Sequence, residues 1–494
     1  MRALRPSHAF LLLALLSLTT LAIRPWSSAR AAGQLDLVGM LATYQPATDA
    51  PDHTLDDATA TPATLRFYSA DAELVHEVAL PLGSAISANA LAPDGRHWAY
   101  LSGAVSGPDA LAQGKELQRD LTLHIVSTLD GTTVITVPLL PSNFPNNISL
   151  NAVALVQRDP SLTEFDDLAE AVWLAFKSSL GLFAWSLDGT QLAFSAATDG
   201  PSTDLYLYDL ATNRVTRLTD GIEQIEGIRW SPDGTWIWHS TISYGYCQVC
   251  DGHHYAAAAD GSTVVTLPGN DIYRFLGWVD DGSYLVTDQA NGPGTFALQR
   301  VEIATGISEM LWDGVHEGYV YDPANLRLGI IGSRERSFDP DTQVFIVDLA
   351  TGQDEEFDDL VSALAGEPWL APLAARPLNH PCHRAGLLVH PCLETPFDPL
   401  SPDGDYRVTS YNAVVESSSG ARILPFAGKL GRRSNVLWRP DSAGIFFVLA
   451  NAIYYRTMMT DTWTTIEPAR FLRWLPHATP AMFAAPTTLD VTTP

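Results

Sequence analysis

The sequence predicts an all-β fold, a β-propeller of four-stranded antiparallel blades, and three observations predict it. A short hairpin pattern recurs along the chain. Most neighbouring copies of this pattern lie between 38 and 48 residues apart. The two ends of the chain hold incomplete units that complement each other. A four-stranded unit of about 40 to 45 residues, repeated along a chain, is the sequence pattern of a β-propeller.

Residues 183–221 show one complete unit. They contain four short runs rich in β-branched and aromatic residues, and turn-forming residues bound each run. In the first turn Asp can hydrogen-bond the backbone and Gly can adopt a positive φ, while Pro presets φ in other copies. The hairpin recurs with its turn at Asp94, Asp188, Asp233, Asp281, Ala324, Asp403 and Asp441.

The chain ends predict how the ring closes. The N-terminal part offers three strands, at 36–45, 64–71 and 73–81, without a turn hairpin before them. The C-terminal residues 471–478 offer a single strand. We expect these strands to combine into one blade, because pairing them removes the exposed edges of an open array. The expected count is then eight blades, with seven as the alternative, over a domain spanning 32–478 and followed by a tail at 479–494.

Three segments carry a family resemblance. The sequences 230-WSPDG-234, 205-LYLYDLATN-213 and 345-FIVDLATG-352 resemble the repeat units of TolB-type, WD-repeat-like propellers. The resemblance covers most of residues 84–470. It implies the propeller fold and says little about activity, because propellers host many functions. Such units also occur in front of peptidase domains, but here the repeats run nearly to the last residue.

Residues 1–31 have the pattern of a secretory signal peptide. Arg2 and Arg5 precede an apolar run at 10–23, and small residues stand at Ala29 and Ala31. An uncleaved membrane anchor is the alternative, but a span needs about 20 apolar residues. We therefore expect cleavage near Ala31 and a secreted, periplasmic or cell-envelope protein. No later run is long and apolar enough to predict a membrane span in the mature chain.

The charge excludes one class of partner. Removing residues 1–31, which hold four arginines and no acid, takes the net charge from −27 to −31. An acidic surface of this size repels phosphate backbones, so we expect no nucleic-acid partner.

Long insertions interrupt the repeat at 103–120, 142–181 and 357–396. Within the second insertion, Ser161 and Glu164 fit a capping box, and apolar residues from Phe165 to Phe176 recur at helical spacing before Gly181. We expect one short helix there, with a strand of a further unit as the competing interpretation.

The topology of antiparallel blades predicts where these insertions lie. The loop between the second and third strands and the connector to the next blade leave the blade at one end, and the Asp-Gly turns lie at the other. Residues 103–120 and 243–254 are loops of the first kind, while 142–181 and 357–396 are connectors. We expect all four at the same face. Because function often lies in loops held by a rigid scaffold, this face is the expected binding surface.

Two clusters of cysteine and histidine lie in these loops. The first, 247-CQVCDGHH-254, and the second, within 376–396, hold all four cysteines. An even number of cysteines in an exported protein favours disulfides, here Cys247–Cys250 and Cys382–Cys392. Zinc is the alternative. The candidate metal ligands are Cys247, Cys250, His253, His254, His380, His383 and His390. In a strand beginning at His253 the two adjacent histidines point to opposite faces, so only one could join the cysteines unless the strand starts later.

Other cofactor and catalytic motifs are missing from the sequence. Haem attachment requires a histidine directly after the second cysteine, where Asp251 stands. Neither G-x-S-x-G nor H-E-x-x-H occurs. Calcium is conceivable at Asp199 and Asp204, or at Asp339 and Asp341, but these aspartates lack a complete ligand series. We therefore expect no cofactor, with zinc or calcium as the alternatives.

Together these features predict a non-catalytic exported propeller that binds a protein, a peptide or a surface glycan. An extracellular hydrolase or lyase acting on a carbohydrate or lactone at the mouth of the central channel is the first alternative. A metal-binding protein that uses the Cys/His loops is the second alternative.

Overall fold

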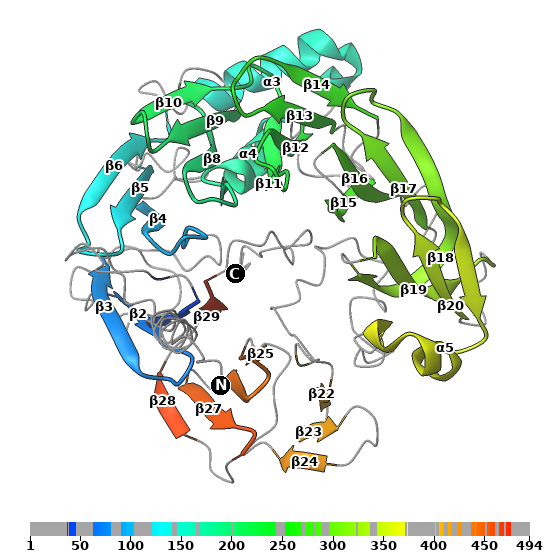
Figure 1. Cartoon of the computed structure of the whole chain (residues 1–494). Helices are drawn as coiled ribbons and strands as arrows, with labels where there is room; N and C mark the ends of the chain where they lie inside the picture. The colour runs from blue at the N-terminus through cyan, green and yellow to red at the C-terminus, as the bar shows by residue number, and fades with distance from the viewer. Residues whose placement is uncertain are drawn as a thin grey trace, which may run out of the picture. The chain divides into compact units, whose positions relative to one another are not determined.

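The computed structural model describes most of residues 37–475, and these residues form a β-propeller (Figure 1). The main stretches outside the described residues are 1–36, 46–62, 81–89, 103–120, 141–145, 244–251, 289–295, 336–342, 374–400, 426–435 and 476–494, with shorter stretches between them. Among the described residues no helix is long and apolar enough to cross a membrane.

Four sheets are four-stranded antiparallel blades. The first consists of β29 (Phe471–Trp474), β1 (Leu41–Gln45), β2 (Ala63–Tyr68) and β3 (Leu74–Leu80). The second consists of β7 (Phe183–Trp185), β8 (Gln191–Ala196), β9 (Asp204–Asp209) and β10 (Arg214–Arg217). The third consists of β11 (Gln224–Trp230), β12 (Trp236–Ile242), β13 (His254–Ala258) and β14 (Val264–Leu267). The fourth consists of β25 (Val436–Trp438), β26 (Gly444–Leu449), β27 (Ala452–Thr457) and β28 (Thr464–Pro468).

A seven-stranded sheet holds two further blades that share one long strand, β18 (Ser308–Asp322). Before β18 come β15 (Tyr273–Trp278), β16 (Ser283–Asp288) and β17 (Phe296–Glu302). After it come β19 (Arg327–Ser333), β20 (Gln343–Asp348) and β21 (Asp354–Phe357). Two sheets have three strands each: β4 (His97–Ser102), β5 (Thr122–Ser127) and β6 (Thr133–Pro138), and β22 (Tyr406–Thr409), β23 (Ala413–Glu416) and β24 (Arg422–Pro425).

The described residues thus contain six four-stranded blades, and the expected count of eight, or seven, is wrong. The error came from counting every Asp-Gly turn as a complete blade. The units around Asp94 and Asp403 contribute sheets with three described strands each. In the first of these, a single bridge between Leu91 and Trp98 stands where a first strand was expected.

The expected pairing of the chain ends is confirmed. β29 pairs antiparallel with β1, from Leu41 opposite Trp474 to Tyr44 opposite Phe471. Just beyond the strand, the Leu475 amide donates to the Met40 carbonyl at 2.9 Å. The C-terminal strand therefore completes a blade whose other three strands come from the N-terminal part of the chain.

The turns follow the expected chemistry. The Asp188 carboxylate accepts hydrogen bonds from the Thr190 amide at 3.0 Å and from the Ser186 hydroxyl at 2.6 Å. Gly189 has a φ of 71°, which favours glycine because it has no Cβ. The tryptophan before such a turn links neighbouring blades. The Trp230 indole donates to the Ala184 carbonyl at 2.9 Å, on the first strand of the preceding blade.

The Gly95 turn gives a test of ring closure, because its neighbours come from both ends of the chain. A Cβ built on Gly95 would lie 2.5 Å from Leu475 Cδ1 and 3.2 Å from Leu37 Cβ, at a φ of 74°. We expect Gly95→Ala to lower the free energy of unfolding by about 3 kcal/mol, combining backbone strain with overpacking. Gly234→Ala is the matched control, since Gly234 has a φ of 73° with nothing within 4 Å. Gly234→Ala should lower the free energy of unfolding by only about 1 kcal/mol. Equal losses for the two variants in urea unfolding would contradict the close packing of the ends around Gly95.

The second insertion contains more helix than the sequence predicted. α3 (Asn146–Arg158) was missed, whereas α4 (Leu168–Ser179) lies within the predicted helix, and Leu168, Val172 and Phe176 are buried as expected. Pro160–Glu164 forms the 3-10 helix η1. The predicted capping box at Ser161 is wrong, because the Asp159 carboxylate accepts from the Ser161 amide and takes the capping role. Gly181 follows the helix with a φ of 74°.

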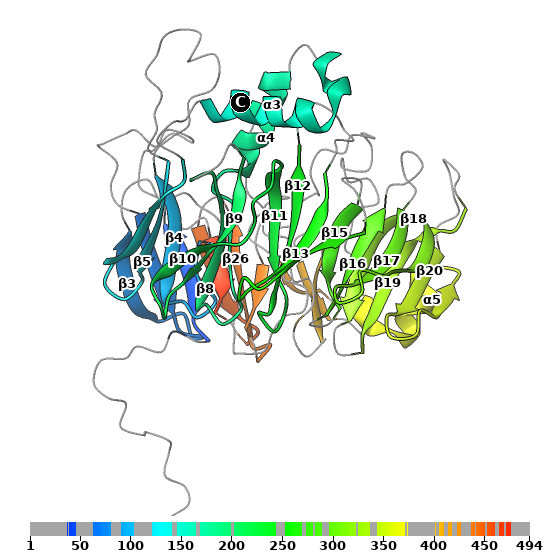
Figure 2. The same cartoon turned by 90° about the horizontal axis from the view of Figure 1, so that it is seen from above.

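The insertions do not all decorate one face. After β21, the chain forms α5 (Leu360–Gly366) and the 3-10 helix η2 (Pro368–Leu370), and Ala363 and Leu370 pack against Val344 and Ile346 of β20. This packing carries the chain along the blade to its turn end. There the Glu367 carboxylate pairs with the Arg327 guanidinium at 2.8 Å. For its described part, the expectation that 357–396 lies with the other insertions is therefore wrong, as Figure 2 shows by the separate positions of α5 and of α3 and α4.

Candidate functional site

The connector between β10 and β11 links a blade, the helical insertion and the next blade. Residues 219–224 leave the second blade and enter the third at the end opposite the Asp-Gly turns, where Gln224 lies opposite Ile242. The base of the 243–254 loop lies at the same end, because β12 ends at Ile242 and β13 begins at His254. We call this end of the blades the insertion face.

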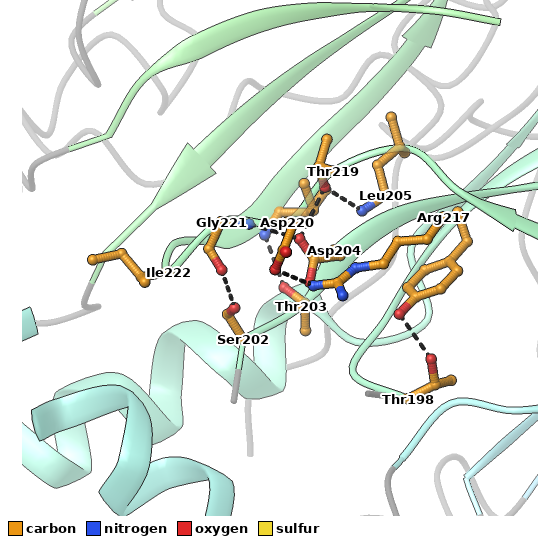
Figure 3. Close-up of polar contacts among 12 residues, drawn as sticks. Thr198, Ser202, Thr203, Asp204, Leu205, Arg217, Thr219, Asp220, Gly221 and Ile222 are labelled. Carbon is orange, nitrogen blue, oxygen red and sulfur yellow. Dashed lines mark hydrogen bonds and ion pairs between the residues drawn. The ribbon is translucent and has the colours of Figure 1, made fainter. Parts of the chain in front are cut away.

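Asp204 holds the connector to the second blade (Figure 3). Its buried carboxylate accepts from the Arg217 guanidinium at 2.6 Å, and from the Gly221 amide and the Thr219 hydroxyl at 3.0 Å each. Burial raises the pKa of the Asp204 carboxyl, although the Gly221 amide and Arg217 act in the opposite direction. With Arg217 as its partner, this carboxylate does not offer the free oxygen ligands expected of a calcium site.

Asn151 of α3 fastens the helical insertion to the connector. Its amide nitrogen donates to the Ile222 carbonyl at 2.8 Å. Its amide oxygen accepts from the Gln224 side chain at 3.1 Å, and the Gln224 oxygen in turn accepts from the Thr203 amide at 2.8 Å. Asn151 and Gln224 are both fully buried. Because buried amides are costly unless hydrogen-bonded, this network specifies how α3 sits on the blades.

Glu223 makes the second attachment. Its side chain is 7% exposed, and its Oε1 accepts from Arg158 Nη1 at 2.6 Å and faces His253 Nδ1 at 2.9 Å. Its Oε2 accepts from the Thr241 hydroxyl, and Arg158 Nη2 donates to the Ser243 hydroxyl at 2.9 Å. One carboxylate therefore joins the end of α3, the connector and both ends of the 243–254 loop. We call Arg158, Glu223 and His253 the carboxylate clamp.

His253 is oriented by this clamp. A carboxylate oxygen can only accept, so the nitrogen facing it, Nδ1, carries the proton. The other nitrogen, Nε2, then has the free lone pair in the neutral ring. The side chain is 37% exposed, so Nε2 can accept a hydrogen bond from a ligand or act as a single metal ligand.

His254 has a different role from its neighbour. It begins β13, is buried, and lies edge-on to Trp238 with ring centroids 5.1 Å apart. The two histidines have different neighbours, since one reaches Glu223 and the other packs on Trp238. The strand begins at His254, one residue later than the expectation assumed. The remaining predicted metal and disulfide residues lie outside the described residues: Cys247, Cys250, His380, Cys382, His383, His390 and Cys392. In the described part of the chain, no group of three or more His, Cys, Asp or Glu could hold a metal ion. Both disulfides and the zinc alternative remain predictions.

Sequence reasoning missed His239, Glu223 and Arg158. His239 of β12 is 1% exposed and stacks on Tyr255 with ring centroids 5.3 Å apart. Burial lowers the pKa of its imidazole to about 4, so the ring is neutral at physiological pH. The apolar residues on both sides of the strand in 236-WIWHSTI-242 could have predicted a strand buried on both faces and hence a buried histidine. No local sequence pattern identifies Glu223 and Arg158 as partners, because the two residues are 65 positions apart in the sequence.

No family model and no curated protein matches the sequence. Solved propeller structures are similar to it at low sequence identity. TolB from Acinetobacter baumannii is 16% identical, with a TM-score of 0.30, over 65% of this chain and 64% of that chain, less than two-thirds of its length. The protein from Agrobacterium tumefaciens described as a putative TolB is 14% identical, with a TM-score of 0.28, over 64% of this chain and 87% of that chain. The propeller domain of the Trilobed protease from Pyrococcus furiosus is 10% identical, with a TM-score of 0.34, over 76% of this chain and 83% of that chain. TolB proteins are among the solved propellers to which this chain is similar at these low identities, and the propeller fold itself is established by the strand order.

Proposed function

We propose that this protein is an exported, non-catalytic β-propeller that binds a protein, a peptide or a surface glycan through its insertion face. The proposal follows from how the helical insertion is held there. α3 is attached at Asn151 by buried amide hydrogen bonds and at Arg158 by the carboxylate clamp. A helix held at two points loses little conformational entropy when a ligand docks on it, which favours affinity.

The observation that carries the proposal is that this fixed helix leaves apolar side chains in solvent. Leu150 and Val153 are 52% and 55% exposed, while Ile148 and Leu155 on the opposite side of α3 are buried. Exposed apolar side chains on a rigid element are typical of an interaction surface. Within the clamp, Arg158 and Glu223 pair with each other and hold α3, and His253 Nε2 is the clamp atom that can contact a ligand.

Binding to peptide and glycan arrays tests the proposal. Glu223→Gln removes the negative charge of the clamp at nearly constant size and frees the end of α3. It should therefore weaken the binding of a ligand found on the arrays roughly tenfold. Asp188→Asn makes the same change at a turn on the opposite end and should alter the affinity less than twofold. Circular dichroism of both variants controls for folding.

Two outcomes of this experiment would count against the proposal. Loss of binding in Asp188→Asn, with Glu223→Gln unaffected, would place the ligand at the turn end. Cleavage of an array glycan or lactone by the wild-type chain would favour the hydrolase or lyase instead.

A further inference from the structure

The outer side of the helical insertion has a definite chemistry. Leu150 and Val153 of α3 project away from the buried side, which consists of Ile148, Asn151 and Leu155. Leu174, 37% exposed, is on the solvent side of α4, whose Val172 and Phe176 are buried in the same core. We call Leu150 and Val153 of α3 the apolar stripe.

Two exposed acidic side chains belong to the same helical insertion as the stripe. Asp159 directly follows α3 and Glu170 lies in the first turn of α4, and both side chains are exposed. The basic group at the end of α3, Arg158, is already paired with the buried Glu223. The whole chain carries a net charge of −27. The net charge therefore attracts a positively charged partner to the protein, and the two described acidic side chains of the insertion, Asp159 and Glu170, act in the same direction.

We propose that the apolar stripe docks a cationic amphipathic segment of a partner protein, a proposal that rests on the binding function of the insertion face. Leucine-like side chains of the partner would cover Leu150 and Val153, as in helix-in-groove recognition. Its lysines or arginines would face Asp159 and Glu170. An anionic membrane surface is disfavoured as the occupant, because it would bring like charges together.

Fluorescence anisotropy with a designed probe tests the proposal. The probe is a fluorescein-labelled peptide of leucine and lysine at amphipathic helical spacing, about 18 residues long, and its partner peptide carries glutamate at every lysine. The full chain is compared with Leu150→Ser/Val153→Ser. The control is Ile307→Ser/Met310→Ser, another exposed apolar pair three residues apart, with Ile307 just before β18 and Met310 within it. All three proteins keep the same charge, so non-specific attraction is constant.

The proposal expects the lysine peptide to bind the wild-type and control proteins alike, and the Leu150/Val153 variant roughly tenfold more weakly. The glutamate peptide should not bind. Equal binding of the lysine peptide to all three proteins would overturn the proposal, since net charge alone would then explain it. Binding to zwitterionic lipid vesicles that the Leu150/Val153 variant loses would also overturn it, in favour of a lipid surface. If the lysine peptide fails to bind while an array ligand still depends on Glu223, this inference fails and the proposed function stands.

Discussion

A chain that ends at Pro468 is expected to lose at least about 4 kcal/mol of unfolding free energy, because it lacks β29 and Leu475. β29 covers the edge of β1, where Leu41, Ala42 and Tyr44 are buried. Leu475 is itself 1% exposed and contributes about 2 kcal/mol by burial. The rest comes from the lost backbone hydrogen bonds between the two strands.

The same truncation should also change solubility. An uncovered β1 presents unpaired amides and carbonyls to other chains, which promotes edge-to-edge association. A chain that ends at Ala478 retains β29 and Leu475 and serves as the control. Urea unfolding and size-exclusion chromatography of the two chains measure both effects. If the chain ending at Pro468 proves as stable and monomeric as the control, pairing of the chain ends does not stabilise the ring.

The free energy of unfolding of the propeller is expected to decrease as the pH is lowered from about 6.5. His239 accounts for about 2 kcal/mol of the decrease between about pH 7 and pH 5. Burial lowers the pKa of this histidine to about 4 in the folded chain, from an ordinary value of 6.5. Below pH 6.5 the unfolded chain binds a proton that the folded chain does not. The stabilising contribution is therefore present above pH 6.5 and is lost as the pH falls towards 4.

His239→Phe isolates this contribution, because phenylalanine keeps an aromatic ring opposite Tyr255 and does not titrate. Asp204 and Asp94 act in the opposite direction, since burial raises the pKa of each carboxyl, and both remain in the variant. The loss of unfolding free energy between about pH 7 and pH 5 should be about 2 kcal/mol smaller in the variant. His239→Gln serves as a second non-titrating replacement. If both variants keep the wild-type pH dependence in urea unfolding, His239 is not the group that titrates.

Local sequence patterns were sufficient for the repeating unit and for the ring's closure. The turn at Asp188 and Gly189 depends on hydrogen bonds between residues at most five positions apart, so it could be predicted from the local sequence. The pairing of β29 with β1 could also be inferred, because the incomplete units at the two ends of the chain complete one blade when they pair. Blade count could not be inferred in the same way. The units around Asp94 and Asp403 carry the same turn pattern as the complete blades but form sheets with three described strands each, and periodicity does not show whether a unit has its fourth strand.

The insertions show where local reasoning ends. α4 was predictable because Leu168, Val172 and Phe176 repeat at helical spacing in an apolar segment. α3 was missed although its apolar residues are separated onto one side as clearly, because asparagine and serine make the segment much less apolar overall. The direction of the 357–396 insertion depends on Ala363 and Leu370 packing on β20 and on Glu367 reaching Arg327. The last of these contacts joins residues 40 positions apart, and no pattern in either segment indicates it.

The sequence by itself determined the propeller class, the turn chemistry and the region where a site was to be sought, because these depend on short-range periodicity and on backbone preferences. Only the tertiary structure decided what the two histidines at the end of the CQVCDGHH motif contact. It separates the two histidines, sending His253 to Glu223 and burying His254 against Trp238. The reason is physical: a buried carboxylate needs partners, and those nearest to Glu223 in space come from α3 and from the loop base, which folding alone brings together.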